Sequence, residues 1–289
     1  MSGLSDIVDG EVEKVAADFE FTEGPLWHPE GFWLFVDTWP NVVYKMVPGG
    51  KPELYREESG RSNGLTFDLQ GLLLMCEGYG RRISRMEADG TITTVMDNYE
   101  GMRLNRPNDL VCHSSGTIYF TDPQSRLEEE YRELPSSMAF RIAPDGVSSV
   151  FETGMDIING LAFSPDERTL YVINTREPKE IIAFDADADG NLSNRHTFID
   201  MTDDPNEGNP DGMKVDVDGT VFSSGPGGIW VVDASGKHLG TIPLPEFPSN
   251  CAFGDNDYRT LLITARTSVY QVRLRTPGVV PPGANALAK

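Results

Sequence analysis

Basic residues and long apolar runs are scarce in this chain. Lys and Arg number 24 against 45 Asp and Glu in 289 residues, which gives a formal net charge of −21. Nucleic acids and anionic membrane surfaces are bound through clustered Lys and Arg, so we expect neither as a partner. No apolar run approaches the roughly 20 residues that span a bilayer, and the sequence therefore predicts no transmembrane helix.

Cysteine is also scarce, and we expect no secretion leader. Cys76, Cys112 and Cys251 are an odd number without the spacing of a zinc ribbon, so they are predicted to be buried thiols rather than disulfides or metal ligands. Residues 1–20 contain dispersed acidic side chains and no apolar segment typical of a signal peptide. We therefore expect a cytoplasmic protein, and no feature of the sequence indicates its oligomeric state.

What the chain does contain is a repeat. Five segments share a leading carboxylate or amide side chain and apolar residues two and four positions later, and glycine stands eight positions after the leader in four of them. A weaker sixth copy occupies residues 249–253. Successive leaders are 38 to 52 residues apart, the length of a four-stranded propeller blade. The six leading residues are Glu23, Asn63, Asn108, Asn159, Asp211 and Ser249, with Asn250 beside the last.

The repeat predicts an all-β fold, a six-bladed β-propeller that forms a single domain over residues 1–289. Its structured core is expected at about 15–275, and the proline-containing tail 276–289 is expected to be disordered. Only residues 124–134 are compatible with a helical turn. If each leading residue begins the innermost strand of its blade, all six side chains converge at one mouth of the central channel.

A single Asn-Gly or Asp-Gly pair is typical of a turn, but six copies in phase favour a ring of oxygen ligands. The oxygens of such a ring suit calcium, magnesium or manganese rather than zinc or copper. We expect one divalent cation, with calcium first and magnesium, manganese or zinc as alternatives. A cation at this mouth can polarise a carbonyl or phosphoryl group and activate water, so hydrolysis is the predicted reaction. The chain has no serine-nucleophile elbow or P-loop, and its four histidines lie outside the leading positions.

Several of these segments resemble the signatures of the gluconolactonase, senescence marker protein and luciferin-regenerating enzyme family, and bacterial gluconolactonases above all. The resemblance covers about residues 15–275. The segments are 23–27 (EGPLW), 105–109 (NRPND), 159–166 (NGLAFSPD), 210–216 (PDGMKVD), 225–230 (GPGGIW) and 250–254 (NCAFG).

The resemblance implies roles for individual residues. The metal ligands would be Glu23, Asn159 and Asp211, with Asn108 as a further ligand or a substrate contact. Asp211 would also be the general base, and Arg106 would contact the lactone. Gln124 would lie on the substrate wall, where residues 124–126 depart from the bacterial pattern.

From residues and resemblance together, we predict a metal-dependent lactonase that acts on an aldono-lactone or a similar small cyclic ester. The cation would hold the carbonyl oxygen and Asp211 would activate water, with hydroxide on the cation as the alternative nucleophile. An organophosphate hydrolase of the related six-bladed kind and a non-catalytic calcium-binding propeller are the alternative functions. The identity of the lactone is left open.

Overall fold

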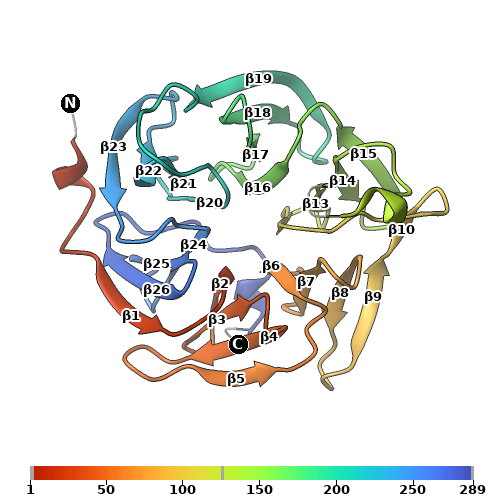
Figure 1. Ribbon diagram of the computed structural model, residues 1–289, viewed down its shortest axis with the longest axis horizontal. Coiled ribbons are helices and arrows are strands. Elements are labelled where there is room, and N and C mark those ends of the chain that lie inside the picture. Colours follow the sequence, from red (N-terminus) through yellow and green to blue (C-terminus); the bar gives the residue numbers. More distant parts are fainter. Residues whose placement is uncertain (1–2, 125–126, 288–289) are drawn as a thin grey trace.

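A computed structural model describes residues 3–124 and 127–287 of the chain. Within these ranges, six four-stranded antiparallel sheets stand around a central axis, and the chain visits them in order around the ring (Figure 1). The predicted all-β, six-bladed β-propeller is therefore confirmed. The predicted burial of Cys76, Cys112 and Cys251 as free thiols is confirmed as well.

Each blade is a meander whose first strand lines the channel. Blade 1 is β2 (Thr22–His28), β3 (Phe32–Asp37), β4 (Val42–Met46) and β5 (Glu53–Arg56). Blade 2 is β6 (Ser62–Phe67), β7 (Leu73–Glu77), β8 (Arg82–Met86) and β9 (Ile92–Met96). Blade 3 is β12 (Leu110–Cys112), β13 (Ile118–Asp122), β14 (Met138–Ile142) and β15 (Ser148–Glu152). Blade 4 is β16 (Ile158–Phe163), β17 (Thr169–Asn174), β18 (Glu180–Ala186) and β19 (Leu192–Asp200). Blade 5 is β20 (Met213–Val215), β21 (Val221–Gly225), β22 (Gly228–Val232) and β23 (His238–Pro243).

The two ends of the chain build blade 6 together. Its inner strands are β24 (Asn250–Gly254), β25 (Thr260–Ala265) and β26 (Ser268–Arg273), and its outer strand is the N-terminal β1 (Glu13–Ala17). β1 pairs antiparallel with β26, so backbone hydrogen bonds between the chain ends close the ring (Figure 1). A short hairpin, β10 (Asn98–Tyr99) with β11 (Met102–Arg103), links blades 2 and 3.

The hydrophobic core is divided among the interfaces between neighbouring blades. Six buried clusters occur in the described part of the chain, and each joins side chains of two adjacent blades. Because a strand exposes alternate side chains to its two faces, each blade contributes to the cluster on either side. The cluster between blades 6 and 1, for example, packs Trp27 and Trp33 against Leu262.

At the channel, neighbouring inner strands approach so closely that glycine is required. An added Cβ would lie 2.9 Å from the Asn108 carbonyl oxygen at Gly64 and 2.5 Å from that of Asp211 at Gly160. The N–H groups of both glycines instead donate to these carbonyl groups, each at 2.7 Å. These glycines follow the leading residues Asn63 and Asn159 inside strands whose register shifts at this point. The Asn-Gly pairs are therefore strand bulges that tie one blade to the next, and not turns.

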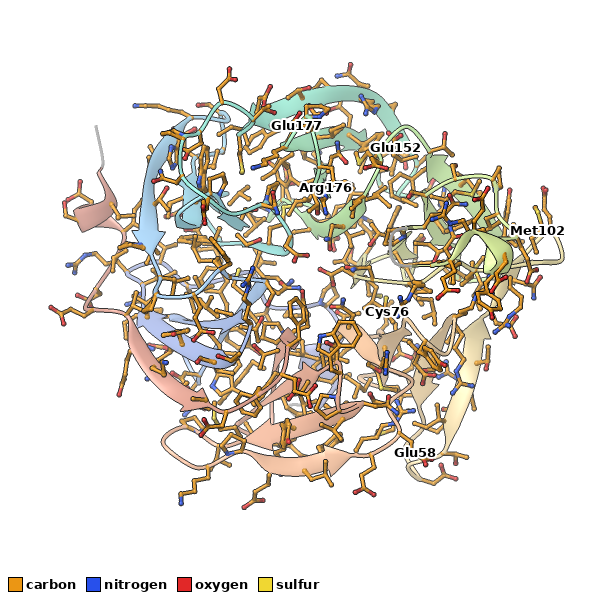
Figure 2. All side chains as sticks on the ribbon, viewed as in Figure 1. Glu58, Cys76, Met102, Glu152, Arg176 and Glu177 are labelled. Carbon is orange, nitrogen blue, oxygen red and sulfur yellow. The ribbon has the colours of Figure 1, made fainter. Side chains whose placement is uncertain are left out.

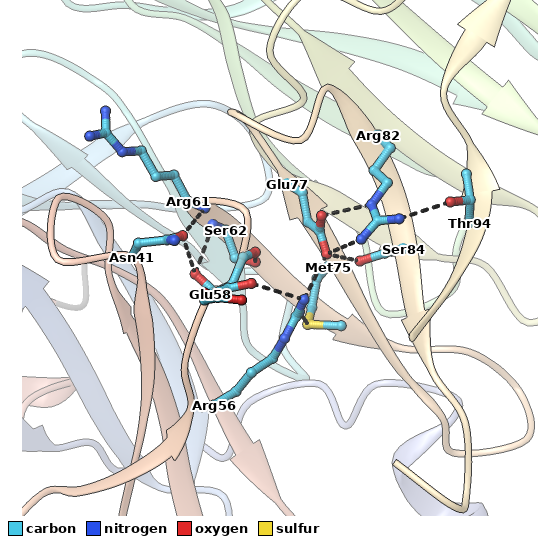
Figure 3. Close-up of polar contacts among 11 residues, drawn as sticks. Asn41, Arg56, Glu58, Arg61, Ser62, Met75, Glu77, Arg82, Ser84 and Thr94 are labelled. Carbon is cyan, nitrogen blue, oxygen red and sulfur yellow. Dashed lines mark hydrogen bonds and ion pairs between the residues drawn. The ribbon is translucent and has the colours of Figure 1, made fainter. Parts of the chain in front are cut away.

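An ion-pair cluster connects the outer parts of blades 1 and 2 (Figure 3). Glu77 is 2% exposed and accepts hydrogen bonds from Arg56 of blade 1 at 3.0 Å and from Arg82 at 2.7 Å and Ser84 at 2.7 Å within its own blade. Burial alone would raise the pKa of Glu77, but these donors outweigh it and lower the pKa. The buried carboxylate of Glu77 thus stays charged, because these three donors compensate its charge.

The C-terminal tail differs from the expected disorder. Its backbone pairs with the far ends of the inner strands, since Val279 N–H donates to Val215 and Pro277 accepts from Val217, both at 3.0 Å. Ala284, at the start of α1 (Ala284–Leu287), is 1% exposed and packs in the cluster between blades 1 and 2. Residues 281–284 form a turn closed by the hydrogen bond from Ala284 N–H to the Pro281 carbonyl at 2.9 Å, and Val280 packs in the same cluster. The tail thus lies against the ends of the inner strands opposite the leading residues.

Helical structure is otherwise limited to two single 3-10 turns in the described ranges, η1 (Leu4–Asp6) and η2 (Glu129–Tyr131). The second falls inside residues 124–134, where one turn was expected. None of the helices in the described part of the chain combines the length and hydrophobicity that crossing a bilayer requires.

Gly160→Ala tests the close approach of the inner strands. The new methyl group would lie 2.5 Å from the Asp211 carbonyl oxygen and 2.8 Å from the Gly212 Cα. We therefore expect the free energy of unfolding, measured in urea, to fall by about 1–3 kcal/mol. Gly3→Ala is the matched control because no atom lies within 4 Å of its added Cβ. Equal stability of the two variants would contradict the proposed packing.

Candidate active site

One cavity of about 550 Å³ opens at the mouth of the channel where the inner strands begin. It is formed by segments that precede first strands, such as residues 106–108, and by loops between second and third strands, such as residues 175–176. The cavity size is ordinary for a small-molecule site. All six predicted leading residues line it: Glu23, Asn63, Asn108, Asn159, Asp211 and Ser249.

Two carboxylates of the ring face this cavity from blades 1 and 5, which are separated by blade 6. Glu23, on β2, is 2% exposed, and its Oε2 accepts from Gly24 N–H at 2.9 Å. Burial first, and then the negative charges of Asp211 and Asp109, raise the pKa of Glu23 well above its ordinary value. Ser224 Oγ holds Asp211 in place by accepting its backbone N–H at 2.7 Å. The two carboxylates therefore repel one another.

The amide side chains of the ring offer oxygens to the same space. Asn159 donates from Nδ2 to Thr175 Oγ1 at 2.9 Å, which leaves its Oδ1 as the group available to a ligand. Asn63 Oδ1 is buried and has no hydrogen-bond partner among the described residues. A buried acceptor without a donor is costly unless an ion, water or ligand supplies the missing contact.

These observations fit a divalent cation. The donors are carboxylate and amide oxygens, the carboxylates are crowded, and one amide oxygen is unsatisfied, as expected for a hard-cation site. Within residues 3–124 and 127–287, no three His, Cys, Asp or Glu side chains gather as a metal-binding group, so amide oxygens would have to complete the coordination. Glu23, Asn159 and Asp211, with Asn108 and Asn63 nearby, are the residues that would hold the ion.

A second polar layer lies beneath the ring. Asp109 and Asn250 take the position that glycine has in four other blades, and they come from opposite blades, 3 and 6. Asn250 Nδ2 donates to Glu23 Oε2 at 3.2 Å and to Asp109 Oδ2 at 3.4 Å. Each side chain also accepts the next backbone N–H, at 2.9 Å. The pair thus spans the channel and fixes Glu23 from below.

The segment that carries Arg106 and Asn108 is anchored by Asp122. Asp122 Oδ2 accepts Asn105 N–H at 2.7 Å, and Asn108 N–H donates to Thr121 at 2.8 Å. Burial raises the pKa of Asp122 to about 7, although the Asn105 and Arg106 N–H groups and the Arg81 charge act in the opposite direction. This carboxyl group therefore positions the predicted substrate contacts without lining the cavity itself.

Of the predicted site residues, the structure places Glu23, Arg106, Asn108, Asn159 and Asp211 in the lining of this cavity, and their chemical roles stay predictions. Gln124 is the exception. Pro123 lines the described wall of the cavity at this point, while Gln124 Nε2 turns away and donates to the Leu134 carbonyl at 2.6 Å. Gln124 N–H also donates to Ser137 Oγ at 3.0 Å, so both its backbone and its side chain are held away from the substrate wall.

Sequence reasoning missed the residues around this ring. Asp109 could have been found as a break in the glycine pattern, because a carboxylate replaces glycine after a leading residue. Asp122 and the rim arginines Arg61, Arg176 and Arg266 lie outside the repeat template, so no spacing marked them.

The chain belongs to the SMP-30/gluconolactonase/LRE-like family, whose model matches residues 21–267. The match spans the inner strands of all six blades and therefore the whole ring.

Relatives over most of the chain include named lactonases. A gluconolactonase of Zymomonas mobilis is 35% identical over 298 residues, which cover 94% of this chain and 83% of that protein. A pentonolactonase of Haloferax volcanii is 30% identical and covers 84% of this chain and 80% of its own length. The solved structure of a gluconolactonase from Xanthomonas campestris has a TM-score of 0.86 at 33% identity, with 95% of this chain and 93% of that chain covered.

Glu23→Gln tests the charge crowding without an activity assay. Because it removes one repelling carboxylate, we expect the variant to melt at or above the wild-type Tm in EDTA and to lose most of the Tm rise that calcium gives the wild type. Glu53→Gln, on an exposed part of β5, is the control. An undiminished calcium shift in Glu23→Gln would argue against this carboxylate as a ligand.

Asp122 predicts a pH dependence of stability. The pKa of Asp122 is about 7 in the folded chain and exceeds the ordinary 3.8. The stability that protonated Asp122 contributes to the folded chain is therefore complete below about pH 3.8 and is lost as the pH rises to about 7. From about pH 5.5 to about pH 8, the wild type should lose on the order of 2 kcal/mol relative to Asp122→Asn in urea unfolding. Parallel pH profiles of the two proteins would rule out the titration of Asp122 in this range.

Proposed function

We propose that this chain hydrolyses a sugar lactone and that one divalent cation, calcium first, is required. The observation that carries the proposal is that Glu23, Arg106, Asn159 and Asp211 reach one cavity from four different blades. The family and the named lactonases among the relatives support the reaction class. The cytoplasmic location and the single-domain organisation stay predictions.

The chain's own residues divide the work of hydrolysis. When bound, the cation would polarise the lactone carbonyl and stabilise negative charge on its oxygen. Arg106 and Asn108, held by Asp122 and Thr121, would orient the ring through its oxygens.

Asp211 would accept a proton from water as the water oxygen bonds to the carbonyl carbon. The ester bond to the ring oxygen then breaks, and the ring oxygen takes a proton to become a hydroxyl. The product is the open-chain hydroxy acid, which releases its proton at neutral pH. This proton release makes the reaction measurable in a pH-stat.

The test is hydrolysis of glucono-δ-lactone, xylonolactone and a phosphofluoridate, after chelation and after the return of Ca²⁺, Mg²⁺, Mn²⁺ or Zn²⁺. We expect lactone hydrolysis to disappear in EDTA and to return with a cation. At saturating cation, Asp211→Asn should reduce kcat about 10²-fold, because an amide keeps an oxygen but cannot accept the proton.

Three results would contradict the proposal. Full lactonase activity in chelated protein would exclude the cation. Hydrolysis of the phosphofluoridate and of no lactone would favour the organophosphate hydrolase. Recovery of Asp211→Asn to near the wild-type kcat at saturating cation would reduce Asp211 to a ligand.

A further inference from the structure

The mouth of the cavity is basic in a strongly acidic chain. Four arginines belong to its described lining, whereas Glu207 is the one acidic residue there outside the proposed cation ring. The chain has almost twice as many acidic as basic residues, so this local excess reverses its overall composition. The four arginines are Arg61, Arg106, Arg176 and Arg266.

Aromatic rings, rather than carboxylates, hold two of these guanidinium groups. Arg61 lies 5.2 Å from the centre of the Trp39 ring and 5.1 Å from that of Tyr79, and Arg266 lies 4.6 Å from that of Phe247. Cation–π contacts of this kind fix the position of a guanidinium and leave its charge available.

The backbone of Arg61 is also held in place. Asn41 Oδ1 accepts its N–H at 2.5 Å, and its φ of 49° is in the left-handed region. Figure 3 shows its guanidinium pointing away from the ion pairs of Glu77. Within the described part of the chain, Arg61, Arg176 and Arg266 form no ion pair, whereas Arg56, Arg82 and Arg273 pair with carboxylates.

Charge balance points to an anionic ligand. A divalent cation would neutralise Glu23 and Asp211, and Glu207 balances one guanidinium, so positive charge is left in excess at the mouth. Arg176 comes from the β17–β18 loop of blade 4 and lies toward the middle of the ring in Figure 2. The excess positive charge therefore faces the path that a ligand takes to the cation ring. Guanidinium groups bind carboxylate and phosphate oxygens with two parallel hydrogen bonds.

We propose that the substrate is an acidic sugar lactone, whose carboxylate or phosphate is bound at the mouth by Arg61, Arg176 and Arg266 while the lactone ring reaches the cation ring. This inference rests on the proposed lactonase function and specifies its substrate class. The carboxylate or phosphate of the substrate increases the rate of encounter and the affinity. It takes no part in the bond changes at the ester.

The test compares kcat/KM for neutral glucono-δ-lactone, for 6-phosphoglucono-δ-lactone and for a glucarolactone. We expect one acidic lactone to exceed the neutral one about tenfold or more at low salt, and this advantage to shrink as salt screens the charges. The acidic lactone that is preferred identifies the group as phosphate or carboxylate. An equal or greater kcat/KM for the neutral lactone would overturn the proposal and leave the lactonase function intact.

Two variants test whether the rim arginines cause the preference for the acidic lactone. Arg176→Gln and Arg266→Gln should each lower the ratio of acidic to neutral kcat/KM about tenfold, mainly through KM. Arg275→Gln is the matched control, because Arg275 is half-exposed and pairs with Asp9 near the chain ends at 3.0 Å. An unchanged ratio in both rim variants would place the preference elsewhere and overturn the assignment.

A binding measurement separates this proposal from the reaction itself. Calorimetry with 6-phosphogluconate, glucarate and gluconate needs no turnover, and we expect an acidic product analogue with a second anionic group to bind at least tenfold more tightly than gluconate. If no lactone is hydrolysed, the proposed function fails, while the calorimetric ratio still decides whether the mouth selects anions. Equal affinities would overturn anion selection.

Discussion

The hydrogen bond from a glycine N–H to a backbone carbonyl of the next blade determines how closely the inner strands approach one another around the channel. Gly64, Gly160 and Gly212 each donate such a bond to a leading residue, at 2.7 to 2.8 Å. Since each bond holds the backbone of a leading residue, the side chain of that residue is directed into the channel mouth. The same contact therefore ties neighbouring blades together at three junctions and helps to gather carboxylate and amide oxygens at one point.

This gathering is unfavourable for the protein alone. Glu23, Asp109 and Asp211 are close enough to disfavour the charge on Glu23, and burial adds to that cost. The large interblade clusters and the β1–β26 closure stabilise the fold sufficiently to hold such a site. A cation would relieve the repulsion, so we infer that stability and ligand binding are coupled at this mouth.

The sequence predicted the architecture because a repeat of six copies shows how often the blade recurs and which residues share a position. It could not assign local conformation, since an Asn-Gly pair fits both a turn and a bulged strand, and the neighbouring blade decides between them. The predictions that Gln124 lies on the substrate wall and that the tail is disordered were wrong for a related reason. The Leu134 carbonyl turns Gln124 away, and the channel end gives Val279 and Ala284 a place to pack. These partners are distant in the chain and leave no local pattern.

The central claim is that the ring of leading residues is a cation site, and a crystal structure of the protein soaked in Mn²⁺ tests it most directly. The anomalous scattering of manganese locates the ion independently of any assumed ligand. The account predicts one strong peak per chain at the channel mouth, in contact with oxygens of Glu23, Asn159 and Asp211. A channel mouth without a peak, in crystals that bind manganese elsewhere, would contradict it.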